Sequence, residues 1–255
     1  MIRIILHGAA GIMGKMVADQ AKRDEDIKIV CGIDVTDGGS AAFPIFTDID
    51  SCDVEADVVI DFSVAAAADK LIAFCDKNKL PLVLCTTGLS DEQIKAAQAL
   101  SQKTAVLRAA NMSLGVNAML ILAADAAKVF APAGFDMEIM ERHHNRKLDA
   151  PSGTALAIAD SINDALDGDY EYTFDRSNRR EKRKKNEIGI SAMRGGNIVG
   201  YHEVVFAGED EVVTITHQAT SRAVFAKGAI EAAKYIYDKP AGMYDMKDVT
   251  GLEGQ

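Results

Sequence analysis

The sequence contains no long hydrophobic run. No stretch of its 255 residues reaches the roughly 18 to 20 apolar residues with which a helix crosses a bilayer. The opening residues, MIRIILHGAAGIMG, also lack the extended apolar core and cleavage site of a secretory signal. We therefore expect no membrane partner and a cytoplasmic location.

Cysteine is scarce and scattered. The four cysteines stand at positions 31, 52, 75 and 85, with neither a C-x-x-C pair nor the dense framework of a disulfide-rich domain. This spacing predicts no metal site and no structural disulfide, as is typical of a protein from a reducing compartment.

Basic residues are outnumbered by acidic ones, 28 against 38, which gives a formal net charge of −10. Because nucleic-acid affinity depends on Lys and Arg that neutralise phosphates, this balance predicts no nucleic-acid partner. Residues 176–186 are an exception, with seven basic residues and one acidic residue. They include no aromatic residue for base stacking, so we interpret them as a mobile, solvated loop near an anionic substrate; a nucleic-acid-binding arm is the alternative.

Two periodicities alternate in the first hundred residues. Continuous apolar runs, typical of strands buried on both faces, alternate with helical patterns. The strand-like runs are residues 2–7, 27–34, 56–62, 81–86 and 104–109, and the helical patterns are residues 11–22, 65–78 and 91–102. Ser90 and Gln93 have the spacing of a capping box. The alternation predicts an α/β domain with a parallel sheet covered by helices.

The pattern changes near residue 112. A long helix at 113–130 and a strand at 135–144 precede a helix that begins at Ser152. Three consecutive strand-like segments and a closing helix follow, at residues 187–193, 200–207, 211–218 and 223–237. Helices followed by consecutive strands predict a second domain of α+β type, after which the chain ends in a short polar tail.

Glycines at positions 8, 11 and 14 follow the first predicted strand and open the first predicted helix. Glycine there lets the backbone turn tightly and approach a pyrophosphate, which the N–H groups at the helix start then bind. Asp34 stands 20 residues after Gly14, where a carboxylate can bond the ribose hydroxyls of an adenosine. These features predict a dinucleotide site; the alternative is a turn in which glycine serves packing alone.

Asp34 also bears on the choice of cofactor. A carboxylate repels a 2′-phosphate, and the neighbouring Val35, Thr36 and Ile12 carry no positive charge, although Lys15 can reach a phosphate. We therefore expect NADH as the preferred cofactor, with NADPH as the alternative.

Residues 141–154, ERHHNRKLDAPSGT, combine charge with a helix start. Five of the six residues 142–147 are cationic or can become so, and the N–H groups of the following helix can hold a carboxylate. This pattern predicts a pocket for a small polyanion, with histidine as proton carrier and lysine as fixed charge; the alternative is a solvated loop. We expect His7 to be packed, and His202 and His217 to be interface or core residues.

Five motifs carry a resemblance to a known family. They are GAAGIMG at 8–14, CTTGL at 85–89, AANMSLGVN at 109–117, HHNRKLDAPSGTA at 143–155 and THQATSRAVFAKGAI at 216–230. In this order they resemble the dihydrodipicolinate reductases of bacterial lysine and diaminopimelate synthesis. The resemblance implies a Rossmann-like dinucleotide domain of residues 1–112 that regains residues 221–255. It also implies a substrate-binding domain of residues 113–220, whose mixed sheet builds a homotetramer.

The resemblance also implies roles for individual residues. The cofactor-binding positions are Gly8, Ala9, Ala10, Gly11, Ile12, Met13 and Asp34, with Cys85, Thr86, Thr87, Ala109, Ala110, Asn111 and Met112 on the nicotinamide side. His143 matches the proton donor and Lys147 a second acid. The contacts to the substrate carboxylates are His144, Gly153 and Thr154. Cys85 stands where the family commonly has glycine, which puts the geometry of that loop in question.

The implied activity is reduction of the cyclic dicarboxylate 4-hydroxy-tetrahydrodipicolinate to tetrahydrodipicolinate, with hydride from NAD(P)H and a proton from His143. Two alternatives are another Rossmann-fold oxidoreductase, such as an amino-acid dehydrogenase, and a non-enzymatic dinucleotide sensor. Neither alternative accounts for residues 143–154.

Overall fold

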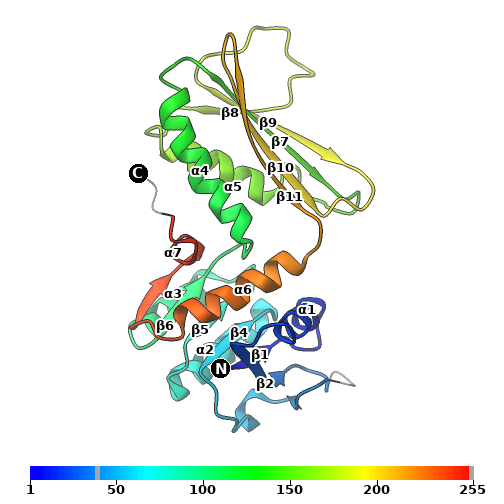
Figure 1. The fold of residues 1–255 in the computed structure, drawn as a ribbon, viewed down its shortest axis with the longest axis vertical. Coiled ribbons are helices and arrows are strands. Elements are labelled where there is room, and N and C mark those ends of the chain that lie inside the picture. Colours follow the sequence, from blue (N-terminus) through cyan, green and yellow to red (C-terminus); the bar gives the residue numbers. More distant parts are fainter. Residues whose placement is uncertain (38–40, 253–255) are drawn as a thin grey trace. The chain divides into compact units, whose positions relative to one another are not determined.

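The computed structural model describes residues 1–37 and 41–252, which divide into two compact units (Figure 1). Unit 1 comprises Met1–Leu114 and Arg222–Thr250, and unit 2 comprises Gly115–Ser221. Residues 251 and 252, which the sequence analysis placed in the first domain, group with unit 2.

Unit 1 is built on a parallel sheet of seven strands. Their order across the sheet is β12 (Gly242–Tyr244), β6 (Ala105–Arg108), β5 (Leu82–Leu84), β4 (Val58–Asp61), β1 (Ile2–His7), β2 (Ile27–Ile33) and β3 (Ile45–Phe46). Each neighbouring pair runs parallel. The predicted α/β class is therefore confirmed.

Helices cover both faces of this sheet. They are α1 (Ile12–Ala21), α2 (Ala68–Asn78), α3 (Asp91–Ser101), α6 (Ala223–Ile236) and α7 (Met246–Thr250), with 3-10 turns at Ile49–Ser51 and Ala65–Ala67. Ile4 of β1 packs in the core with residues of α1 and α6, whereas Ile5 packs with residues of α2 and α3. Successive strand residues point to opposite faces, so both faces of β1 must be apolar. The predicted capping box of Ser90 and Gln93 is present at the start of α3.

Unit 2 contains a mixed five-stranded sheet. Its order is β11 (Val212–Ala219), β10 (Gly200–Ala207), β7 (Asp136–His143), β9 (Glu187–Arg194) and β8 (Glu171–Phe174). β10 runs antiparallel to both β7 and β11, while β9 runs parallel to β7 and β8. The helices α4 (Leu114–Phe130) and α5 (Gly153–Asp164) share a core cluster with this sheet, as Met119 and Ile158 do with Ile139. The predicted second domain with a mixed sheet is confirmed.

The elements missed by the sequence analysis are short. β3, β8 and β12 have two, four and three residues. The expectation of a polar tail was wrong, because β12 pairs with β6 and α7 buries Met246 in the core.

Candidate active site

The carboxyl ends of the parallel strands bring the predicted cofactor residues to one edge of the first sheet. Four of them come directly after the last residue of a strand: Gly8 after β1, Asp34 after β2, Cys85 after β5 and Ala109 after β6. Asp61 is the last residue of β4. In open α/β sheets, ligands bind outside this edge.

Two positions of the glycine loop require glycine. Gly8 has a φ of +79°, and a Cβ there would lie 2.5 Å from the carbonyl oxygen of Phe62. A Cβ on Gly14 would lie 2.2 Å from the carbonyl oxygen of Gly8, so α1 approaches the loop closely only without a side chain. Gly11 is the N-cap of α1 and has no side chain to cap it, which leaves the helix start suited to an anion.

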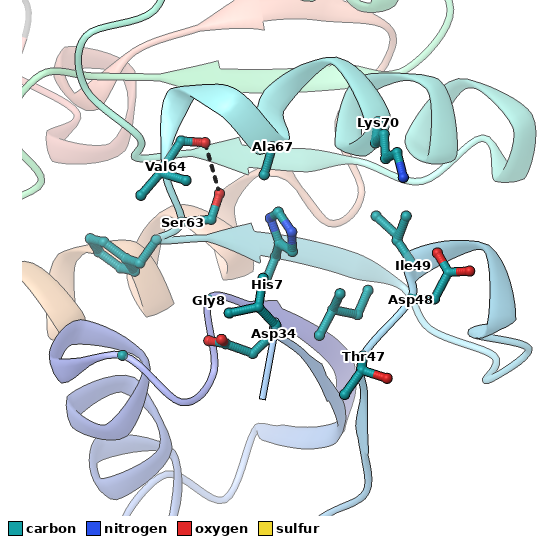
Figure 2. A pocket seen from close by; sticks show the side chains of 14 residues that line it. His7, Gly8, Asp34, Thr47, Asp48, Ile49, Ser63, Val64, Ala67 and Lys70 are labelled. Carbon is teal, nitrogen blue, oxygen red and sulfur yellow. Dashed lines mark hydrogen bonds between the residues drawn. The ribbon is translucent and has the colours of Figure 1, made fainter. Parts of the chain in front are cut away.

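Asp34 borders a cavity at this edge of the sheet. Its Oδ2 accepts a hydrogen bond from the Ala10 N–H at 2.9 Å, which ties the end of β2 to the glycine loop. The cavity, of about 350 Å³, is also lined by Gly8, Gly11 and several apolar side chains of unit 1. Figure 2 shows Asp34 and Lys70 on opposite sides of it. Its volume and apolar walls suit a small ligand such as an adenosine group.

The residues predicted for the nicotinamide side differ in exposure. Cys85 and Thr86 are buried, whereas Thr87 and Ala110 are exposed. Met112 is buried in the core of unit 1. Among the described residues the non-glycine positions with positive φ are Lys79, Asp167 and Asp175, so the backbone of Cys85 is ordinary. The cysteine therefore imposes no backbone strain on this loop.

His7 does more than the packing role expected of it. Its Nδ1 lies 2.8 Å from Oδ1 of Asp61, and both side chains are buried. Burial by itself would raise the pKa of Asp61, but the hydrogen bond and charge of His7 outweigh it and lower that pKa. The ring of His7 also lines the cavity, as Figure 2 shows, so the expectation of packing alone was incomplete.

One face of the second sheet changes from apolar to polar along its strands. On β7 the buried side chains are apolar up to Ile139, and Glu141 and His143 then follow. Arg194 on β9 stands opposite His143, and His202 on β10 stands opposite Glu141. Because opposite residues share a face, four polar side chains gather at one end of the sheet.

Glu141 is the centre of this polar cluster. Its Oε2 accepts from Nδ1 of His143 at 2.6 Å and from Nη1 of Arg194 at 2.7 Å. Its Oε1 accepts from Nη2 of Arg194 at 2.7 Å and from the Ser152 N–H at 2.9 Å. Burial would raise the pKa of Glu141, but the hydrogen bonds from His143 and Arg194 lower it to about 2. Glu141 is therefore a carboxylate at neutral pH.

His202 packs against His143 from the neighbouring strand. The two rings meet edge to face, with centroids 5.1 Å apart, and Nε2 of His202 lies 3.1 Å from Oγ of Ser152. Burial, together with the charge of His143, lowers the pKa of His202 to about 4. His202 is thus neutral at neutral pH and acts as a polar packing partner.

Lys147 and the start of α5 form the cationic side of the candidate site. Nζ of Lys147 lies 2.8 Å from Oδ2 of Asp149, and this contact, with a backbone hydrogen bond from Gly153 among the smaller causes, lowers the pKa of Asp149. A Cβ on Gly153 would meet nothing within 4 Å, so the first turn of α5 has open space beside it. His144 directly follows β7, and Thr154 lies in that first turn. Fixed charge and backbone N–H groups can thus bind a carboxylate here.

The basic run at residues 176–186 is a loop whose residues are exposed except for Arg176 and Arg183, which agrees with the predicted solvated loop, but those two arginines are tied to the sheet. Arg176 lies 2.9 Å from the buried Glu187 and 3.1 Å from Glu138. Arg183 pairs with Glu138 and Asp136 and donates to backbone carbonyls. These arginines anchor the segment to β7 and β9, so their charge is neutralised within unit 2.

Neither a metal centre nor a membrane helix occurs in the part of the chain that the structure describes. Residues 1–37 and 41–252 include no group of three or more His, Cys, Asp or Glu side chains that could hold a metal ion. In the same ranges no helix is long and apolar enough to cross a membrane.

Several members of the polar cluster were not predicted from the sequence. Arg194 and Ser152 were given no role, and His202 was expected to be only an interface or core residue. The alternation from Met137 through Ile139 to Glu141 and His143 carried a signal, because it places two titratable residues on a buried strand face. Nothing in the local sequence places Arg194 beside them.

The parallel sheet, the glycine loop and the acid after β2 define an NAD(P)-dependent oxidoreductase with a Rossmann-like domain. Comparison with known proteins gives the family. The profile described as "Dihydrodipicolinate reductase, N-terminus" matches residues 2–112, and that described as "Dihydrodipicolinate reductase, C-terminus" matches residues 115–250. The chain belongs to the dihydrodipicolinate reductase family.

Individual relatives agree with this assignment. The 4-hydroxy-tetrahydrodipicolinate reductase of Caldanaerobacter subterraneus subsp. tengcongensis is 49% identical, with 98% of each chain covered. The enzyme of the same name from Clostridium tetani is 47% identical, with 96% of each covered. A solved structure, the dipicolinate-bound dihydrodipicolinate reductase of Paenisporosarcina sp. TG-14, superimposes with a TM-score of 0.82 at 25% identity, covering 97% of this chain and 99% of that one.

Proposed function

We propose that this chain reduces 4-hydroxy-tetrahydrodipicolinate to tetrahydrodipicolinate, a step of diaminopimelate and lysine biosynthesis. The observation that carries the proposal is the polar cluster of unit 2, where the buried His143 is hydrogen-bonded to the carboxylate of Glu141. Relatives that share 49% and 47% of their residues with this chain are named for this activity.

The residues of unit 1 fit a nicotinamide dinucleotide. The close approaches at Gly8 and Gly14 and the uncapped start of α1 suit its phosphates, and Asp34 suits a ribose. Residues 85–87 and 109–112 are assigned to its nicotinamide side. When bound, the nicotinamide supplies a hydride. We assign NADH as the preferred form, because the Asp34 carboxylate repels a 2′-phosphate; Lys70, in the same cavity, is the side chain that would favour NADPH.

Unit 2 is assigned to the substrate. Its two carboxylates need cations and N–H donors, which Lys147, His144 and the Gly153–Thr154 turn of α5 supply. The structural relative from Paenisporosarcina is described as dipicolinate-bound, and dipicolinate is a ring with two carboxylates. That description supports a cyclic dicarboxylate as the substrate class.

His143 is assigned as the proton donor. Loss of water from the 4-hydroxy substrate gives a conjugated imine. Hydride addition to this imine leaves an electron-rich enamine that must take up a proton, and histidine titrates near neutrality. Nδ1 of His143 is engaged by Glu141, so Nε2 is the nitrogen left to deliver a proton. Lys147 stabilises the developing negative charge or donates in its turn.

We also propose a homotetramer and a cytoplasmic location. With α4 and α5 on one face of the second sheet, the opposite face carries Met140 and Met193, which are 36% and 49% exposed. On this face the guanidinium of Arg142 stacks over the ring of Tyr201 at 4.4 Å. An open sheet face with exposed methionines is suited to pairing with a second copy.

The test is oxidation of NADH or NADPH with substrate generated in the assay by dihydrodipicolinate synthase from pyruvate and aspartate semialdehyde. We expect substrate-dependent oxidation that is faster with NADH. Faster oxidation of NADPH would leave the reaction in place but contradict the role given to Asp34. Folded protein that oxidises neither cofactor would contradict the proposed reductase activity.

A further inference from the structure

We infer that Glu141, held by Arg194, is a positioning residue for His143, which fixes its tautomer and orientation so that Nε2 is the atom that transfers the proton. The inference rests on the proposed function, because it assigns a partner to the proposed proton donor. It adds two residues, Glu141 and Arg194, to the machinery of that step.

The strand itself places Glu141 beside His143. Residues two apart on a strand point to the same face, and both side chains lie on the buried face of β7. Oε2 of Glu141 lies 2.6 Å from Nδ1 of His143. Because an ionised carboxylate only accepts hydrogen bonds, Nδ1 must carry the proton in this contact. The neutral ring therefore has its lone pair on Nε2. This nitrogen takes up a proton from solvent to give the imidazolium, which the Glu141 carboxylate stabilises, and the protonated ring is the form that donates from Nε2.

Arg194 and Ser152 hold the carboxylate in one orientation. Arg194 donates to both oxygens at 2.7 Å, and this bidentate geometry fixes the plane of a carboxylate most strongly. The Ser152 N–H adds a second donor to Oε1, and His143 adds one to Oε2. Four hydrogen bonds on a side chain that is fully buried leave Glu141 no alternative rotamer.

The surroundings of Nε2 point to its use. A Cβ on Gly200 would lie 3.3 Å from this nitrogen, which is tighter than ordinary van der Waals contact, so glycine leaves the nitrogen room. The edge-to-face contact with His202 holds the ring from the side. Nδ1 is thus anchored, and Nε2 keeps space for a partner.

The variant Glu141→Gln tests this arrangement. Each oxygen of Glu141 accepts two hydrogen bonds. The NH₂ group of a glutamine can only donate, so in either amide orientation it would face two other donors and lose both hydrogen bonds. We expect kcat to fall on the order of 100-fold, with the KM for NADH unchanged. Arg194→Lys keeps the charge but loses the bidentate contact, and we expect a smaller loss of kcat.

The matched control is Glu138→Gln. Glu138 lies on the same strand and is also bound by arginines, Arg176 and Arg183, but it does not contact His143. We expect it to retain the kcat of the parent protein. Equal losses in the Glu138 and Glu141 variants would show a general effect on the sheet and would overturn the inference.

A second readout does not depend on activity. Nitrogen-15 NMR of the unliganded protein reports which nitrogen of His143 carries the proton, and we expect Nδ1 in the parent protein and a shift toward Nε2 in Glu141→Gln. A neutral His143 ring protonated on Nε2 in the parent protein, or a glutamine variant with unchanged kcat, overturns the inference. A parent protein that oxidises neither NADH nor NADPH contradicts the proposed function instead, while the NMR result still decides the tautomer.

Discussion

Each unit of the protein contains a buried histidine paired with a buried carboxylate, and the two pairs are built differently. His7 and Asp61 lie opposite each other on neighbouring strands, with Nδ1 and Oδ1 2.8 Å apart. His143 and Glu141 lie two residues apart on one strand, with Nδ1 and Oε2 2.6 Å apart. The first pair joins β1 to β4 where the glycine loop begins. The second pair joins no strands, because both of its residues belong to β7.

The neighbours of the two carboxylates separate the pairs further. Asp61 also accepts the Ser63 N–H at 3.0 Å, a bond within the turn after β4. Glu141 is instead held by the guanidinium of Arg194, a full positive charge. An imidazole and a carboxylate therefore support the chain at one place, and at the other the carboxylate orients the ring. The role of a buried ionisable pair follows from what surrounds it.

The largest expected difference between the two histidines is in catalysis. We expect His143→Gln to lower kcat by about 10²- to 10⁴-fold while changing KM far less, because proton transfer belongs to the transition state. His7→Gln, which keeps a donor toward Asp61, is the comparison variant. Because the ring of His7 lines the cofactor cavity, we expect its effect on the KM for the cofactor, with kcat within a few-fold of the parent value. Steady-state kinetics of both variants measures this. An unchanged kcat for His143→Gln would remove that residue from the proton-donor role.

The second prediction concerns Lys147, the cation of the second unit. We expect Lys147→Ala to lower kcat/KM on the order of 100-fold, with rate and substrate affinity falling together, since a fixed charge serves both the bound carboxylate and the developing charge. Lys103→Ala is the control, because Lys103 forms an exposed pair with Asp76. Equal kinetic constants for the two alanine variants would contradict the assignment of Lys147.

The third prediction is one of stability. We expect Asp61→Asn to lower the free energy of unfolding by about 1–3 kcal/mol, because it weakens a buried charged hydrogen bond between two strands. The lowered pKa of Asp61 gives the sign of its pH dependence, since its stabilisation exists above the unfolded pKa and is lost as pH falls. Urea unfolding of parent and variant at neutral pH and at pH 3, below the ordinary pKa of 3.8, tests both statements. A difference in stability that grows toward low pH would contradict them.

The two pairs also show which features of the structure could be predicted from the sequence. Strand and helix order in unit 1 followed from apolar periodicity, and Gly8, Gly14 and Asp34 were placed at one sheet edge by their spacing. The Asp61 partner of His7 was not foreseen, because a contact between two strands depends on register, which local pattern does not contain. Arg194 was missed for the same reason, since 53 residues separate it from Glu141. The basic run at residues 176–186 is exposed as predicted, but the ion pairs of its arginines were not foreseen, because their acidic partners lie on strands distant in sequence.

The smallest expected effect concerns His202 and acid stability. Its pKa is lowered to about 4 from the ordinary 6.5, so between these values the unfolded chain binds more protons than the folded one. The free energy of unfolding therefore decreases as pH falls from 6.5 to 4. The pKa of Glu141 is lowered to about 2 from 4.5, so the stability that this carboxylate contributes is lost only below pH 4.5. The contributions of His202 and Glu141 to stability therefore fall in different pH ranges.

The variant His202→Gln removes the first of these contributions and leaves the second. We expect its melting temperature to change less between pH 6.5 and 4.5 than that of the parent protein, while both fall alike below pH 4. Thermal unfolding across this range measures the two slopes. Parallel curves from pH 6.5 to 4.5 would mean that His202 is not kept neutral by burial beside His143. The polar face of the second sheet would then be open to water. Burial would in that case not fix the orientation of the Glu141 carboxylate.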